Sequence, residues 1–268
     1  MNARFQDQVI WITGASSGIG RAVAVLLGGE GAHLILSGRR VDALEETAAA
    51  APGTHMVLPF EATDYDRLDD ITAKAFGWHG RIDMLFNNAG VSQRSTCLET
   101  DMAVYRQLME IDVFAPIALT KAVLPKMVEA GSGHIAVVSS VAGKFGAPKR
   151  TGYCAAKHAL QGFFDALRSE VTHLGLGVSL ITPGFVNTAI ARNALTGSGA
   201  AQGHDDADIA SGMPVDTAAG IIVDGLAKRQ DEIPVARGRE LEALWLKRLW
   251  PSMLTRKLAK MGAAAANG

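Results

Sequence analysis

Short runs of apolar, often β-branched residues alternate along the chain with longer segments in which apolar residues recur at helical spacing. Several of the short runs are apolar at every position, as expected of strands that helices cover on both faces. The runs predict strands at residues 9–13, 33–37, 56–60, 83–88, 134–140, 178–183 and 232–236. The longer segments predict helices at about residues 19–30, 41–50, 65–78, 100–129, 152–173 and 215–229.

This alternation indicates right-handed βαβ connections, which build a parallel sheet. We therefore expect an α/β fold of the Rossmann type, a doubly wound parallel sheet of about seven strands flanked by helices on both faces. The 268 residues contain no internal repeat and are an ordinary length for one domain with a large sheet. We expect a single catalytic domain at residues 1–240 and a C-terminal extension at residues 241–268.

Two segments depart from the alternation. Residues 189–213 are rich in Gly, Ala and Asp without any period, which predicts a mobile loop. Residues 241–261 place Leu, Trp and Met at helical spacing beside five basic residues, and Pro251 interrupts them. One interpretation is an amphipathic helix on an anionic membrane surface. The other, which we favour, is a helix that covers a cleft or a subunit interface.

Composition excludes several classes of function. The 48% of hydrophobic residues suffices for a core, and 26 Lys and Arg against 27 Asp and Glu give no electrostatic reason to expect a nucleic-acid partner. Two cysteines without a CxxC pair and seven scattered histidines predict neither a disulfide framework nor a metal site. The N-terminal stretch lacks the pattern of a signal peptide, and no apolar run is long enough to span a membrane. We expect a cytoplasmic protein, with peripheral membrane association as the alternative.

Residues 13–20 (TGASSGIG) follow the first strand and open the first helix. Gly14 would allow the tight exit from the strand, Gly18 would let the backbone approach a pyrophosphate, and Gly20 would let the helix pack against the sheet. The helix N-terminus would offer N–H groups to the phosphates. This position favours a dinucleotide site over a plain structural turn. The predicted contacts are Gly14, Ser16, Ser17, Gly18, Ile19 and Gly20.

The residues after the second strand indicate which dinucleotide binds. Gly38 stands where a carboxylate would bind the ribose 2′-hydroxyl of NAD, and Arg39 and Arg40 follow it. A guanidinium there suits the 2′-phosphate of NADP, whereas the alternative is that both arginines only solvate a loop. The sequence therefore predicts NADP(H) as the preferred cofactor, with NAD(H) as the second candidate.

Four more motifs follow in order along the chain: Asn87-Asn88-Ala89-Gly90, Ser139-Ser140, the pair Tyr153 and Lys157, and Pro183-Gly184-Phe185-Val186-Asn187-Thr188. Together with residues 13–20, they resemble the short-chain dehydrogenase/reductase family over about residues 7–236. Five ordered motifs at matching spacings are specific as a set. The stretch GYCAAKHALQGFFDALRSE is most similar to the branch that contains the dehydrogenase/reductase member seven proteins.

The resemblance implies a Rossmann-type sheet, a nicotinamide cofactor, a small-molecule substrate and a homodimer or homotetramer. It also implies a catalytic site. Tyr153 would be the general acid/base that gives its proton to a carbonyl oxygen during reduction, and Ser140 would hydrogen-bond the same oxygen. Lys157 would bind the nicotinamide ribose and stabilise the tyrosine phenolate. Residues 189–213 would be the substrate loop.

The chemistry of these residue types agrees with that assignment. A free tyrosine has a pKa of about 10, so it is a poor base at neutral pH unless a cation stabilises its phenolate. A lysine four residues further on lies on the same helical face, one turn away. The serine adds a donor for a developing alkoxide, and the hydride comes from the cofactor, so no metal is needed.

The resemblance also places the remaining cofactor contacts. Glu61 and Ala62 lie where the family contacts the adenine, usually through Asp. The other contacts lie after the fourth and sixth strands: Asn88, Ala89 and Gly90 beside the adenosine ribose, and Pro183, Gly184, Val186 and Thr188 around the nicotinamide, together with Tyr153 and Lys157.

Asp112 departs from the family, which usually has Asn there to hold a water joined to the lysine. An ionised Asp only accepts hydrogen bonds. The carboxylate could still hold the water while weakening the effect of Lys157 on Tyr153, or the site is impaired. We include Asp112 among the catalytic candidates and predict an active NADP(H)-dependent carbonyl reductase that interconverts a secondary alcohol and a ketone. The alternative is a weakly active or inactive dinucleotide-binding sensor or scaffold.

Overall fold

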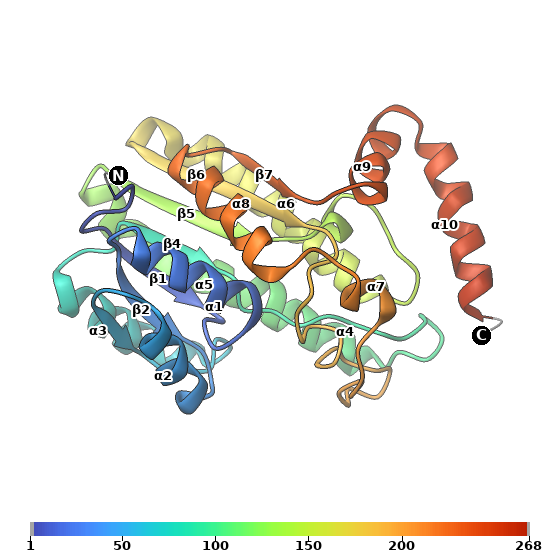
Figure 1. The fold of residues 1–268 in the computed structure, drawn as a ribbon, viewed down its shortest axis with the longest axis horizontal. Helices are drawn as coiled ribbons and strands as arrows, with labels where there is room; N and C mark the ends of the chain where they lie inside the picture. Colours follow the sequence, from blue (N-terminus) through green and yellow to red (C-terminus); the bar gives the residue numbers. More distant parts are fainter. Residues whose placement is uncertain (1–2, 267–268) are drawn as a thin grey trace.

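A computed structural model of the chain describes residues 3–266. At its centre lies a sheet of seven parallel strands in the order β3-β2-β1-β4-β5-β6-β7 (Figure 1). The strands are β1 (Val9–Thr13), β2 (His33–Ser37), β3 (His55–Val57), β4 (Met84–Asn87), β5 (Gly133–Val138), β6 (Leu176–Pro183) and β7 (Glu232–Val235). The predicted fold class is confirmed, and each predicted strand overlaps one of these seven.

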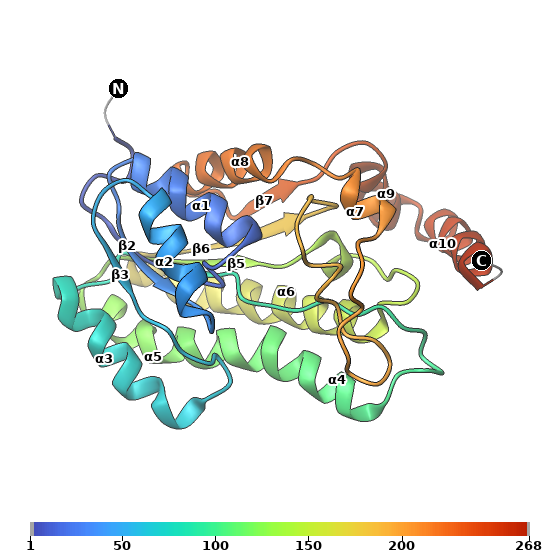
Figure 2. The ribbon, with the colours of Figure 1, turned by 60° about the horizontal axis from the view of Figure 1, so that its bottom comes forward.

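Helices cover both faces of the sheet. Figure 2 shows α1 and α8 on one face and α3, α5 and α6 on the other. The helices are α1 (Gly18–Gly29), α2 (Val41–Ala50), α3 (Leu68–His79), α4 (Met102–Met109), α5 (Ala115–Glu129), α6 (Thr151–Val171), α7 (Ala207–Ala210), α8 (Val215–Ala227), α9 (Arg239–Leu249) and α10 (Pro251–Ala266).

The two-sided cover explains why the strands are apolar throughout. In β1, Ile10 and Ile12 are buried in the core on one face, and Val9 and Trp11 are buried in the core on the other. Side chains of a strand alternate between faces, so a strand in a covered sheet needs apolar residues at both sets of positions. The indole of Trp11 donates a hydrogen bond to Ser37 Oγ at 2.8 Å, which satisfies its polar atom inside this core.

The strand order reverses at β1. This strand pairs with β2 on one side and β4 on the other, both in parallel. In such a sheet the loops after β1 and after β4 diverge at the carboxyl ends of the strands and leave a crevice there. The loops that follow β1, β2, β4, β5 and β6 therefore meet at one edge of the sheet, where the sequence motifs lie.

One predicted helix is interrupted. The segment predicted at about 100–129 consists of α4, a π-helical turn at Glu110–Phe114 and α5. A π turn inserts one residue into a helix without disturbing its apolar spacing much, so the periodic pattern did not reveal it. Asp112 lies inside this turn. The substrate-loop segment at 189–213 also holds more structure than its composition predicted, because it contains α7 and a bridge between Leu195 and Ala201.

The C-terminal helices α9 and α10 form a pair at one end of the molecule, beyond the sheet (Figure 1). Pro251 is the first residue of α10, a position where a helix needs no N–H partner, so it separates the two helices. Residues 267–268 of the predicted extension lie outside the described residues. Within residues 3–266, none of the helices is long and apolar enough to cross a bilayer.

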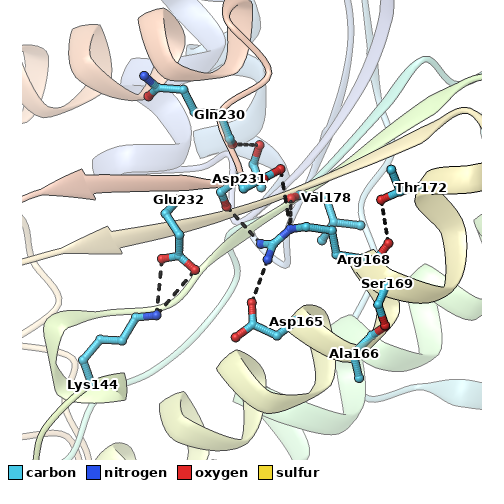
Figure 3. Close-up of polar contacts among 11 residues, drawn as sticks. Lys144, Asp165, Ala166, Arg168, Ser169, Thr172, Val178, Gln230, Asp231 and Glu232 are labelled. Carbon is cyan, nitrogen blue, oxygen red and sulfur yellow. Dashed lines mark hydrogen bonds and ion pairs between the residues drawn. The ribbon is translucent and has the colours of Figure 1, made fainter. Parts of the chain in front are cut away.

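Arg168 fixes α6 to the end of the sheet (Figure 3). Its Nε donates to the carbonyl of Val178 in β6 at 2.8 Å, and Nη2 donates to the carbonyl of Asp231 beside β7 at 3.0 Å. Nη1 binds the Asp165 carboxylate one turn earlier in the helix at 2.8 Å. Because α6 carries Tyr153 and Lys157, these bonds help to set the position of both residues relative to the strands.

Candidate active site

A long open cleft follows the carboxyl ends of the strands, and most of the predicted site residues line it. These are Gly14, Ser16, Ser17, Gly18, Ile19, Arg39, Arg40, Glu61, Ala62, Asn88, Ala89, Gly90, Ser140, Tyr153, Lys157, Pro183, Gly184, Val186 and Thr188. Two predicted residues lie elsewhere: Gly20 and Asp112 are buried behind the cleft wall.

The glycine turn after β1 needs its glycines for two physical reasons. Gly14 and Gly18 have φ angles of +65° and +55°, in the left-handed region that L side chains rarely adopt. A Cβ at Gly20 would lie 2.3 Å from the carbonyl oxygen of Gly14, so this glycine serves the packing of the turn on itself. Ser17 precedes α1 and makes no capping hydrogen bond through its side chain, which leaves the first amides of the helix available to an anion.

Thr13, the last residue of β1, joins the glycine turn to the loop after β4. Its Oγ1 accepts hydrogen bonds from the backbone N–H groups of Asn88 and Ala89 at 3.0 and 3.1 Å. The Asn88 side chain donates in return to the carbonyls of Thr13 and Gly14 at 3.1 and 3.2 Å. These bonds fix the loops after β1 and β4 relative to one another at the point where the strand order reverses.

The two arginines after β2 line the cleft and are exposed to solvent. Arg39 Nη1 lies 3.7 Å from Glu61 Oε2, and Arg40 Nη2 lies 3.5 Å from Ser16 Oγ. Glu61 therefore pairs with the arginine that we predict to bind a 2′-phosphate. A Cβ built on Gly38 has its nearest neighbours at 3.6 Å, which is ordinary van der Waals contact, so the backbone tolerates a Cβ there.

Tyr153 and Lys157 lie on one face of α6, and both are nearly buried, with 8% and 5% of their surface exposed. Lys157 Nζ lies 5.6 Å from the centre of the Tyr153 ring and donates to the Val138 carbonyl at 3.2 Å. Ser140 comes from the end of β5 and donates to the Pro183 carbonyl at 3.4 Å. Tyr153, Lys157 and Ser140 therefore supply a phenol, a nearby ammonium group and a second hydroxyl to the lining of one cleft.

Gln93 supports the start of α6 and was not predicted from the sequence. Its Oε1 accepts hydrogen bonds from the backbone N–H groups of Gly152 and Tyr153 at 2.7 and 3.3 Å. The side chain is fully buried and satisfies donors that the first turn of a helix leaves open. A lone glutamine in a loop gives no pattern that would have indicated this role.

Asp112 lies behind Lys157 rather than in the cleft, with 1% of its surface exposed. Its Oδ1 accepts from the Val91 N–H at 2.8 Å, and Oδ2 lies 3.8 Å from Lys157 Nζ with no hydrogen-bond partner among the described residues. Burial raises the pKa of the Asp112 carboxyl above its usual range, while the Lys157 ammonium opposes this rise. A Cβ at Gly90 would lie 2.9 Å from Oδ1, so Gly90 lets the carboxyl approach the backbone.

The C-terminal helices form one wall of the cleft. Leu246 of α9 and Leu254 of α10 line it and pack with Phe145 from the loop after β5. Glu240 at the start of α9 accepts hydrogen bonds from the Phe185 N–H at 2.6 Å and the Arg237 N–H at 3.0 Å, which ties this wall to the loop after β6. Neither Phe185 nor Glu240 was predicted as a site residue.

Comparison with known proteins identifies the family. Residues 8–198 match the family described as short chain dehydrogenase. The chain belongs to this family. It is 40% identical over 264 residues to "Dehydrogenase/reductase SDR family member 7B" of Danio rerio, which covers 95% of this chain and 85% of that protein. The predicted resemblance to the family and to its member seven branch is therefore confirmed.

Solved structures show the same fold for this short-chain dehydrogenase. One from Burkholderia phymatum, in complex with NAD, has a TM-score of 0.80 and 25% identity and covers 91% of this chain and 94% of that one. A metagenomic short-chain oxidoreductase in complex with NADP has a TM-score of 0.72 and 29% identity over 87% of this chain and 98% of that one. An oxidoreductase that uses a nicotinamide dinucleotide is thus supported, and the preference for NADP stays a prediction.

Proposed function

We propose that this short-chain dehydrogenase is an NADP(H)-dependent carbonyl reductase that interconverts a ketone and a secondary alcohol. The observation that carries the proposal is that Tyr153, Lys157 and Ser140 line the same cleft as the glycine turn. A proton donor, a cation for its phenolate and a second hydroxyl are the groups that an alkoxide needs, and they lie together beside a dinucleotide crevice.

The cleft residues suit a nicotinamide dinucleotide. The left-handed Gly14 and Gly18 keep side chains away from the turn, and the first amides of α1 are open to a pyrophosphate. Arg39 and Arg40 would bind the 2′-phosphate, and Pro183, Gly184, Val186 and Thr188 would bind around the nicotinamide. When bound, the cofactor supplies the hydride for reduction or takes it up for oxidation.

The protein's own residues would handle the proton and the oxygen. During reduction the Tyr153 hydroxyl would give its proton to the carbonyl oxygen, and during oxidation the phenolate would take a proton from the alcohol. Ser140 would turn its hydroxyl from the Pro183 carbonyl, where the bond is a long 3.4 Å, to the same substrate oxygen. Lys157, held by Val138, would stabilise the phenolate.

Asp112 is the observation that favours a second candidate, a dinucleotide-binding sensor or scaffold with little turnover. A buried carboxylate beside Lys157 would partly cancel the positive charge on which the phenolate depends. NADPH oxidation with a panel of ketones separates the two candidates. Turnover with at least one ketone supports the reductase, and binding of NADPH without any turnover across the panel supports the sensor.

The predicted preference for NADP can be tested at Gly38. In the Gly38→Asp variant, a carboxylate would repel the 2′-phosphate and bind the 2′-hydroxyl, and the Cβ of the new side chain meets no atom closer than 3.6 Å. We expect the ratio of NADPH to NADH affinities to fall by at least roughly tenfold, as measured by fluorescence titration. Gly77→Asp, at a helical glycine that no neighbour approaches, is the matched control and should leave the ratio unchanged. Tighter binding of NADH than of NADPH by the wild type would contradict the preference.

A homodimer or homotetramer stays a prediction, and a membrane contact through residues 241–261 stays the less favoured alternative to a helix that covers the cleft or a subunit interface. The exposed residues around the junction of α9 and α10 support the membrane contact, because Trp245 and Trp250 are 63% and 60% exposed beside Lys247 and Arg248. Sedimentation with anionic liposomes tests it. Equal pelleting of the full chain and of a chain that ends at residue 240 would exclude this contact.

A further inference from the structure

Two arginines lie in the wall of the cleft beside the proposed catalytic residues. Arg94 comes from the loop after β4, and Arg150 immediately precedes α6, three positions before Tyr153. Only 8% and 18% of their side chains are exposed, although both line the cleft. Neither belongs to the motifs of the dinucleotide site, so their role concerns the substrate part of the cleft.

The two guanidinium groups share one carboxylate. Arg94 Nε donates to Asp206 Oδ2 at 2.5 Å, and Arg150 Nη2 lies 3.5 Å from the same oxygen. Arg94 also donates to Ser92 Oγ and to the Gln93 carbonyl, both at 2.7 Å. Arg94 is therefore well satisfied, and it holds the Asp206 carboxylate at a shorter distance than Arg150 does.

Arg150 is left with little compensation. Among residues 3–266 its guanidinium makes no hydrogen bond, and its carbon lies 5.8 Å from the centre of the Phe185 ring. Burial and then the charge of Arg94 lower the pKa of Arg150, while the Asp206 carboxylate opposes them only in part. A guanidinium nonetheless stays charged in proteins, and a mostly buried one whose ion pair with Asp206 is long, at 3.5 Å, and shared with Arg94 costs free energy unless another anion joins it.

The position of Arg150 indicates where that anion belongs. Phe185, against which it lies, directly follows Gly184 in the loop that we propose to flank the nicotinamide, and Tyr153 is one turn further along α6. An anion on Arg150 would thus lie close to the carbonyl group of a substrate held by Tyr153. Of the other cations that line the cleft, Lys257 is paired with Glu242. Arg237, Arg239 and Lys260 belong to the exposed C-terminal side of the cleft and not to the loop before Tyr153.

We propose that Arg150, supported by Arg94, binds a carboxylate of the substrate, so that the substrates are oxo acids and the matching hydroxy acids. This inference rests on the proposed function and names its substrate class. Two guanidiniums and one Asp206 carboxylate leave one positive charge, which a carboxylate balances. A phosphate monoester has a second pKa of about 6 and carries nearly two negative charges at neutral pH, so it fits less well. The flat fork of a guanidinium also matches a carboxylate in two parallel hydrogen bonds.

The test compares a carboxylate with its neutral amide in the full-length protein saturated with NADP⁺. The probes are 4-phenylbutanoate and 4-phenylbutanamide, whose phenyl group suits the apolar cleft wall of Leu246 and Leu254. In calorimetric titrations we expect the acid to bind the wild type at least roughly tenfold more tightly than the amide, as for a hydrogen bond to a charged group. Arg150→Gln should remove this preference, and Arg150→Lys should keep part of it.

Two further variants sharpen the result. Arg192→Gln changes an exposed arginine that pairs with Asp205 in the same loop and does not line the cleft, so it should keep the preference. Asp206→Asn removes the carboxylate that competes for Arg150, so it should increase the preference for the acid over the amide. Melting temperatures near that of the wild type show that each variant is folded.

The inference is overturned if the acid binds the wild type no better than the amide does, or if neither compound binds. It is also overturned if the preference for the acid over the amide survives in Arg150→Gln. Stronger binding of phenethyl phosphate than of the acid would also overturn the carboxylate assignment. Because these titrations involve no turnover, their outcome does not depend on whether the protein reduces ketones. If the protein reduces no ketone, the proposed reductase function is wrong. If it reduces neutral ketones but no oxo acids, the reductase function holds and the inference about the substrate class is wrong.

Discussion

Asp112 is a buried carboxyl with an incomplete set of partners, since one oxygen binds the Val91 N–H and the other only faces Lys157 at 3.8 Å. Its burial raises its pKa, so the fold favours the neutral form more than water does. A neutral Asp112 would leave the charge of Lys157 undiminished, and an ionised one would weaken it. The residue therefore bears directly on how strongly the lysine supports Tyr153.

We predict that Asp112→Asn keeps or raises the turnover of the reductase. The amide oxygen can still accept from Val91, while the negative charge beside Lys157 disappears. The measurement is kcat with NADPH and the best ketone of the panel. Asp112→Leu, which removes the acceptor for Val91 as well, should lower kcat. A large loss of kcat in Asp112→Asn would show that the carboxylate has a specific role of its own.

Site residues that belong to sequence motifs could be predicted one by one from the sequence. Site residues that act only through tertiary contacts could not. Tyr153 and Lys157 have a spacing that can be recognised in the chain, and Gly14 has a fixed place after a strand. Gln93 and Glu240 instead act on backbone groups 59 and 55 residues away in sequence. No local pattern marks such a contact, because it exists only after the chain has folded.

At the scale of elements, the position of α6 on the sheet depends on polar contacts near both ends of the helix. Gln93 binds the backbone at its start, and Arg168 binds carbonyls beside β6 and β7 near its end (Figure 3). Carbonyls at the edge of a sheet need such partners. The helix is thus held to the sheet by hydrogen bonds as well as by its apolar side.

Loss of Arg168 should destabilise the protein without changing the chemistry directly. Arg168→Ala removes two hydrogen bonds from a charged donor to backbone carbonyls, and we expect the free energy of unfolding to fall by about 2 kcal/mol. Urea unfolding measures this change. The control Arg67→Ala removes an exposed pair with Asp64 at 3.9 Å and should cost less than about 0.5 kcal/mol. Equal losses in the two variants would contradict this role of Arg168.

Apolar periodicity predicted the elements well where one face or both faces of an element are buried. The seven strands and α6 follow from it, because burial and hydrogen-bond geometry act on every residue of these elements. It did not reveal the π turn at Glu110–Phe114, where a single extra residue hardly changes the pattern. The turn nevertheless positions Asp112, so the missed detail is one that matters for the site.

At the scale of the whole molecule, the buried His134 links stability to pH. It lies in β5 with 3% of its surface exposed, and its Nε2 lies 2.8 Å from Ser179 Oγ in β6. Burial, followed by the charge of Arg229, lowers the pKa of His134 to about 4. The unfolded chain takes up this proton near pH 6.5, whereas the folded chain resists it until about pH 4, so the folded state loses stability as the pH falls through this window.

Between pH 7 and pH 5 the histidine alone should lower the free energy of unfolding by about 2 kcal/mol. Urea unfolding at both pH values gives the total loss, and His134→Gln should reduce that loss by about this amount. The exposed His173→Gln is the matched control and should leave the loss as it is in the wild type. If His134→Gln and the wild type lose the same free energy, His134 is not the group that responds.

The Tyr153→Phe variant tests most directly whether a proton donor on α6 acts beside a bound dinucleotide. The ring and its packing stay, while the hydroxyl that would transfer the proton is removed. We predict that the variant binds NADPH with an affinity close to that of the wild type, measured by fluorescence titration, and that its rate of ketone reduction falls by at least about 100-fold. Ketone reduction by Tyr153→Phe at a rate near that of the wild type would contradict the account.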